Sequence, residues 1–171
     1  MKKAILFTFG IGDTFCSEKS TRVIRRGPAI ANQARNLAKS TKYDFFGVVR
    51  VNEPLDTFRD INLAKDIPNT RVIDVKLCSN SVFDINNQIT IPGVDDSPEV
   101  ILDGNQLDHI IRADEFEIFI AGIDINGVFV RFMRELEKRG YSATIFSDII
   151  KPFNKNTIEV IKNSKVKFGK S

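Results

Sequence analysis

Five side chains lie beside apolar segments and carry groups that could do nucleophilic or acid–base chemistry. They are Cys16, Cys78, Lys76, Asp13 and Asp124. A thiol has an ordinary pKa near 8.5, so at neutral pH it becomes a nucleophile only with a base or a cation beside it. Lys76 lies two residues before Cys78, and these two form one possible reactive pair. No histidine or aspartate lies in a sequence motif that would place it beside them as a base.

Each of these residues also has a structural interpretation. The two cysteines suit small buried hydrophobic positions, and Lys76 suits a salt bridge at the rim of a sheet. Asp13 suits a loop-capping carboxylate, because aspartate readily accepts hydrogen bonds from nearby backbone amides. Asp124 would place a negative charge in a pocket, or it would cap the following helix together with Asn126.

The composition predicts a single domain over residues 1–171. The chain has 171 residues with 42% hydrophobic content, which is enough to bury a core without disulfides or a structural metal, and its net charge is +3. The densest basic cluster is Arg22, Arg25 and Arg26, which predicts a solvated face rather than a nucleic-acid surface. Two cysteines indicate a reducing compartment such as the cytoplasm. No apolar run is long enough to span a membrane.

The hydrophobic pattern alternates between strands and helices. Short apolar runs predict strands over 4–9, 45–49, 71–75, 116–121, 141–146 and 166–168. Apolar stripes predict helices that begin near Gly27-Pro28, near Leu107, at Val128 and near Ile158. This order predicts a three-layer, doubly wound α/β domain with a mainly parallel sheet. Proline and glycine predict loops over 51–70 and 84–104.

Ligands of such sheets bind at the carboxyl ends of the strands, so the loops after Phe9, Val75 and Ala121 matter most. In these loops the chain resembles the isochorismatase-like cysteine hydrolases, which include the nicotinamidases. The segments 4–15, 75–83 and 118–129 stand where that family has Asp-x-Gln-x-Asp-Phe, a lysine before Ser-x-Phe, and Gly-x-x-Thr-x-x-Cys-Val. Gly140-Tyr141 and Ser147-Asp148 follow in the family's order.

The resemblance implies a cysteine nucleophile, an aspartate that handles its proton, and a nearby lysine. In this chain the nucleophile falls on Val128 and the acid on Phe9, or on Gly10 with a different gap. Neither position carries a group that can substitute. Lys76 is retained, and the backbone amides of Asp124 and Val128 would form the oxyanion cradle. In the family a cis peptide often lies in this turn, which here would precede Asp124.

The nicotinamidase branch also binds a metal through an aspartate and several histidines. This chain has one histidine, His109, on an expected helix away from the three loops. The corresponding stretch offers Glu53, Asp56 and Asp60 but no imidazole, and a solvated loop explains it better than a metal site. We therefore predict no metal and no cofactor.

Three functions remain open. The first is a pseudoenzyme that binds a small molecule or an anion in a pocket formed by Phe9, Asp13, Lys76, Asp124 and Val128. The second is an interaction or structural protein that recognises a protein partner through the loops 51–70 and 84–104; the family resemblance also implies a homo-oligomer. The third is a hydrolase with rebuilt chemistry that uses Cys78 and Lys76.

Overall fold

A computed structural model describes residues 1–51, 72–77, 81–91, 98–124, 127–151, 155–164 and 166–171 of the chain. Within these ranges the side chains of 13–14, 50–51, 72, 74–77, 128–129 and 155–158 are not described. Lys76, Asp13 and Val128 are therefore placed by their backbones alone. Cys78, Glu53, Asp56 and Asp60 lie outside the described residues, as does almost all of the expected loop over 51–70.

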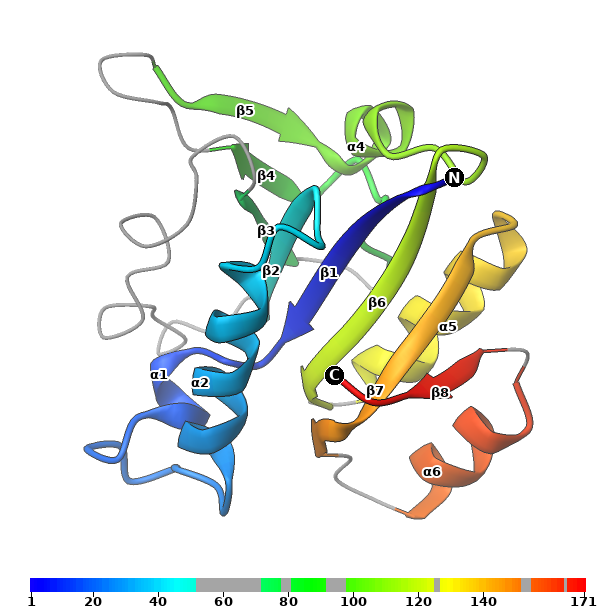
Figure 1. Cartoon of the computed structure of the whole chain (residues 1–171). Coiled ribbons are helices and arrows are strands. Elements are labelled where there is room, and N and C mark those ends of the chain that lie inside the picture. Colours follow the sequence, from blue (N-terminus) through cyan, green and yellow to red (C-terminus); the bar gives the residue numbers. More distant parts are fainter. Residues whose placement is uncertain (52–71, 78–80, 92–97, 125–126, 152–154, 165) are drawn as a thin grey trace.

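The described residues form one twisted sheet of eight strands in the order β5-β4-β3-β2-β1-β6-β7-β8 (Figure 1). The pairs from β3 through to β8 are parallel, while β4 and β5 are antiparallel additions at one edge. The strands are β1 Lys3–Phe9, β2 Phe45–Val51, β3 Val72–Leu77, β4 Gln88–Ile91, β5 Val100–Asp103, β6 Phe116–Ile123, β7 Ser142–Lys151 and β8 Lys167–Gly169.

Helices cover both faces of this sheet, as the alternating pattern predicts. They are α1 Asp13–Cys16, α2 Gly27–Ala38, α4 Gly104–Ile110, α5 Val128–Lys138 and α6 Lys155–Lys162. One apolar cluster joins a face of the sheet to α1 and α2, and a second joins the other face to α4, α5 and α6. The chain therefore has the expected three-layer α/β fold with a mainly parallel sheet. None of the helices in the described part of the chain is long and apolar enough to cross a bilayer.

Strand β1 determines where a ligand site should lie. The chain runs from β1 outward to β2 and β3 on one side, and later returns to β1's other side as β6. In open sheets this reversal of direction leaves a crevice at the carboxyl ends of the two central strands. Here those ends are Phe9 on β1 and Ile123 on β6, beside α1 and close to the start of α5 (Figure 1).

The segment 84–104 corrects one prediction. It was expected to be a loop, but its described parts form strands β4 and β5 and the first residue of α4. The two strands have four residues each, so their alternation is too short to distinguish them from irregular chain. Asp103 then caps α4 through a reciprocal pair of hydrogen bonds with Gln106.

Helix α5 ends as the sequence predicts. Gly140 has a φ of 79°, and its N–H donates to the carbonyl of Glu137, while the N–H of Tyr141 donates to the carbonyl of Leu136. This is a Schellman cap, in which a left-handed glycine satisfies the last carbonyls of a helix. It turns the chain directly into β7, whose first residues pair with the start of β6.

Both tyrosines of the chain are buried, and this predicts an alkaline pH dependence. Burial raises the pKa of Tyr43 and of Tyr141 to about 12, with smaller contributions from Glu117 and Asp108 respectively. The unfolded chain releases these protons near pH 10 and the folded chain does not. We therefore expect stability to fall as the pH rises from about 10 to 12, by on the order of 2 kcal/mol per tyrosine. A phenolate absorbance titration in buffer and in urea checks this result, and native titration near pH 10 would contradict it.

Candidate functional site

The carboxyl ends of β1 and β6 lie against each other, and Phe9, to which the resemblance assigns the family's acid unless Gly10 takes it, is apolar. Phe9 pairs in register with Gly122, and the Phe9 side chain is only 2% exposed. Its ring packs against Phe132 on α5, with 5.0 Å between the ring centroids. Phe7 contacts the same Phe132 ring from one pleat back along β1, at 5.3 Å. Phe9 thus belongs to the core beneath α5 and offers no group for proton transfer.

At Asp124, the turn after β6 differs from the oxyanion cradle that the family resemblance implies. The backbone N–H of Asp124 donates to the carbonyl of Lys151 at the end of β7, over 3.0 Å. That amide is therefore engaged within the sheet rather than directed at a ligand. The peptide bond before Asp124 is trans, since the described residues contain no cis bond. The Asp124 residue is 1% exposed, so a carboxyl group is buried at this edge.

Helix α5 begins at the same edge. Its N-cap residue is Gly127, with a φ of 71° and no side-chain cap hydrogen bond. Val128, the position of the family's nucleophile, is the first residue of the helix, and its hydrocarbon side chain has no nucleophilic atom. The backbone thus brings Phe9, Asp124 and Val128 to one edge of the sheet.

Lys76 and Asp13 reach this edge from flanking elements. Lys76 pairs in register with Arg50, one residue beyond the level at which Val49 pairs with Phe9. Strand β3 is separated from β1 by β2, so the Lys76 backbone lies about 10 Å from β1. Asp13 begins α1, which follows directly from the end of β1.

Cys16, the cysteine that the structure describes, is buried in the apolar core. Cys16 is 6% exposed within the cluster beneath α2, and its thiol donates to the carbonyl of Gly10 at 3.5 Å. This environment matches the interpretation as a small buried hydrophobe.

The basic cluster of Arg22, Arg25 and Arg26 is a surface feature, because all three arginines are exposed. Arg22 lies over the Phe15 ring, and Arg26 donates to the carbonyl of Asp148.

Arg131 is a residue that the sequence interpretation missed. It lies on the side of α5 that also carries Glu135 and Arg139, one turn nearer the helix start. Arg139 binds Glu135 at 2.7 Å and Asp108 at 2.5 Å, and stacks over Phe83. Among the described residues Arg131 makes no side-chain hydrogen bond, and its Nε atom is buried without a partner. In the sequence it looks like an ordinary member of the polar face of α5.

The described residues do not fit the metal site of the nicotinamidase branch. They hold no group of three or more histidine, cysteine or carboxylate side chains able to bind one ion. His109, the single histidine of the chain, is exposed in the last turn of α4. Transition-metal sites of this type need imidazole ligands. We therefore derive no chemistry through a metal.

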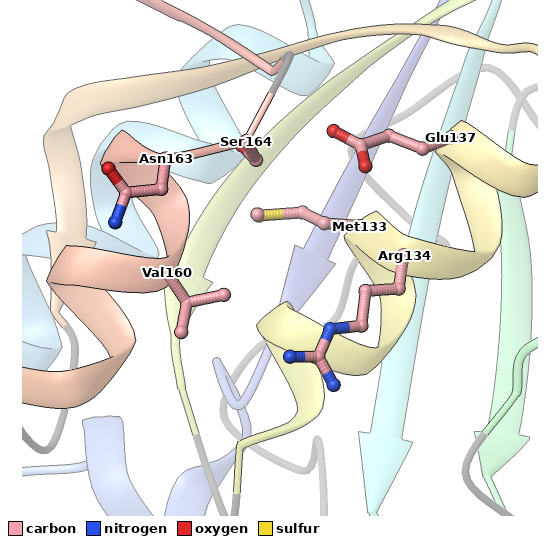
Figure 2. A pocket seen from close by; sticks show the side chains of 6 residues that line it. All are labelled: Met133, Arg134, Glu137, Val160, Asn163 and Ser164. Atoms are coloured by element: carbon pink, nitrogen blue, oxygen red, sulfur yellow. The ribbon is translucent and has the colours of Figure 1, made fainter.

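Two cavities lined by described residues lie elsewhere, between α5 and the segment that includes α6 and β8. The first has a volume of about 270 Å³, and its lining side chains all reach it from α5 or from the end of α6 (Figure 2). The second, of about 320 Å³, shares Glu137 with the first and extends past Tyr141 to Lys167. The sequence gives no signal for either cavity, because both form where two helices and a strand meet.

Comparisons with known proteins agree with this fold. No family profile matches the sequence, and no curated protein matches it. Among solved structures the chain is similar to a pyrazinamidase of Pyrococcus horikoshii in complex with zinc, with a TM-score of 0.67 and 13% identity over 99% of each chain. It is also similar to PnC1 from L. infantum in complex with nicotinate, with a TM-score of 0.65 and 11% identity over 99% of this chain and 93% of that one.

A third similar structure gives the fold its name. It is an isochorismatase-like hydrolase from Alkaliphilus metalliredigens, with a TM-score of 0.62 and 13% identity over 99% of this chain and 94% of that one. The fold of the chain is therefore that of the isochorismatase-like hydrolases. At these identities the likeness extends to the fold and not to the chemistry.

Proposed function

We propose that this chain is a non-catalytic protein on the isochorismatase-like fold that binds a small anionic molecule at the carboxyl edge of its sheet. The observation that carries the proposal is the packing of Phe9 against Phe132, at the position of the family's acid. A cysteine hydrolase needs a proton acceptor beside its nucleophile, and neither Phe9 nor Val128 supplies a functional group.

Two features support an anion as the ligand. Arg131 lies on α5 next to Phe132, the residue that packs on Phe9, and its Nε atom is buried without a partner among the described residues. A buried N–H group without a hydrogen bond is costly, and a carboxylate that accepted one from Arg131 Nε would recover that cost. Lys76 is a second cationic residue, retained in the sequence, and its backbone lies at the same end of the sheet.

The proposal predicts binding without turnover. Nicotinate is a suitable probe because the L. infantum protein of this fold was solved in complex with it. For a Kd of about 1 mM, about 10 mM nicotinate should raise the melting temperature by roughly 3–5 °C, and neutral nicotinamide should raise it less. Neither nicotinamide nor pyrazinamide should release ammonia above the buffer rate.

Arg131→Gln is the test variant, with Lys138→Gln as a charge-matched control on the exposed part of α5. The first should remove the preference for nicotinate over nicotinamide, and the second should keep it. Ammonia release would overturn the proposal and favour the rebuilt hydrolase, for which loss of turnover in Cys78→Ser is the minimum requirement. No saturable binding, with no turnover either, would favour a protein-interaction role.

One observation favours that second role, recognition of a protein partner or of another copy of the chain. Val100 and Ile101 are 49% and 56% exposed on β5, which is the edge strand of the sheet. Ile85, next to this edge, is also exposed. An apolar edge strand with unpaired backbone groups is a typical surface for strand addition. If the role is correct, Ile101→Lys should reduce self-association, measured by size-exclusion chromatography with light scattering, or binding of a partner.

A further inference from the structure

The smaller of the two cavities beside α5 has the composition of a ligand site that is separate from the carboxyl edge of the sheet. Figure 2 shows Met133 and Val160 facing each other across it, from α5 and α6. Met133 is 1% exposed, so its thioether forms the floor of the cavity. The volume of about 270 Å³ equals that of about nine water molecules in the liquid, which leaves room for a single aromatic ring with one substituent.

Two of the polar side chains around this floor, Arg134 and Asn163, carry N–H groups that can donate hydrogen bonds. Among the described residues, neither the Arg134 guanidinium nor the Asn163 carboxamide has a side-chain hydrogen bond or an ion pair. Ser164 is already satisfied, because its hydroxyl donates to the carbonyl of Ile161 at 2.7 Å and accepts from the N–H of Val166 at 3.2 Å.

The charges around the cavity favour an anion. Glu137 is the one acid in the lining, and it already has an interaction partner. Lys167 lines the adjoining cavity, so a second cation lies along the same groove. An apolar floor with a guanidinium group and an amide at its rim is complementary to a small molecule with an apolar body and one carboxylate.

We propose that the groove between α5 and α6 binds small amphiphilic carboxylates, with the apolar body on Met133 and Val160 and the carboxylate on Arg134. Arg134 lines the cavity from α5, and its side chain runs along that helix toward the helix start (Figure 2). Its planar guanidinium can donate two parallel hydrogen bonds to a carboxylate, and a neutral amide of the same shape cannot accept the same pair. Ligand choice at this site is therefore set by charge.

The chain offers a direct reporter, because it contains two methionines, Met1 and Met133. In protein labelled with ¹³C at the methionine methyl groups, benzoate should shift the Met133 signal saturably, and Met1 serves as the internal reference. Benzamide should need about a tenfold higher concentration for the same shift, the ratio expected for one charge-assisted pair.

The variants are Arg134→Gln and, as control, Lys138→Gln. The first should bring benzoate and benzamide to equal affinity, and the second should leave the difference intact. Arg131→Gln should also leave it intact, so this site can fail or succeed independently of the proposed function. Equal shifts from benzoate and benzamide in the wild-type protein, or a preference for benzoate that survives Arg134→Gln, would overturn the proposal. So would the absence of any saturable Met133 shift at millimolar benzoate.

Discussion

Phe9→Asp is expected to lower the free energy of unfolding by about 5 kcal/mol or more at neutral pH. The substitution introduces the acid that the family resemblance assigns to this position, but the Phe9 side chain is 2% exposed and packs against the Phe132 ring. Truncating a buried phenylalanine costs about 3–5 kcal/mol through lost contacts and the cavity left behind. An unpaired carboxylate in that cavity adds the cost of its own desolvation.

The loss should depend on pH with a definite sign. Burial disfavours the charged form, so the pKa of the new carboxyl group is raised in the folded state above its unfolded value near 3.9. Below that unfolded value the group is neutral in both states, and the additional cost is absent. As the pH rises above about 4 the unfolded chain releases the proton that the folded chain retains, so the variant loses stability until the folded pKa is reached.

Phe9→Leu is the matched control for Phe9→Asp. It keeps an apolar side chain on Phe132, so it should cost about 1–2 kcal/mol and show no additional pH dependence. Urea unfolding at pH 4 and pH 7 measures both variants. If Phe9→Asp were as stable as Phe9→Leu at pH 7, water would have to reach this position. The carboxyl edge of the sheet would then be a hydrated pocket, and a carboxyl group at position 9 would be able to take part in proton transfer there.

The fold was predictable because its signals are local. Central parallel strands are buried on both faces, so β1 and β6 appear in the sequence as continuous apolar runs, and Gly140 marks the end of α5. Strands β4 and β5 were missed because they lie at an edge. Val100 and Ile101 are exposed on the edge strand β5, and Ile89 is the only fully buried residue of β4, so burial imposes little pattern on either segment.

The candidate site was predictable as a set of positions and not as a set of contacts. The motif order places Phe9 and Val128 at one edge, which the topology reproduces. The hydrogen bond from the Asp124 amide to the Lys151 carbonyl depends on an irregularity in β7: Ile120 pairs with Ile145, but Gly122 pairs with Ile150. No local pattern specifies such a bulge, because the partners are far apart in the sequence.

Gly122→Ala is expected to be the other strongly destabilising substitution, at about 4 kcal/mol or more. Gly122 has a φ of 113°, a conformation that residues with a Cβ atom rarely adopt and that costs on the order of 1–3 kcal/mol to impose. A Cβ atom there would also lie 2.2 Å from the carbonyl oxygen of Phe9 and 2.8 Å from its nitrogen. Both obstacles are backbone atoms of the central strand, so a side-chain rotation cannot relieve the contact.

Gly140→Ala separates the two causes. Gly140 also has a positive φ, 79°, but a Cβ atom there would meet nothing within 4 Å. Its substitution should cost about 1 kcal/mol, the conformational penalty alone. For a chain of this length, these two losses of stability correspond to falls in melting temperature. The fall is roughly 2–4 °C for Gly140→Ala and about 10 °C or more for Gly122→Ala. Equal losses in the two variants would mean that β1 and β6 can separate at their carboxyl ends without cost. The close approach of Gly122 to the Phe9 backbone would then not be a contact that holds the two central strands together.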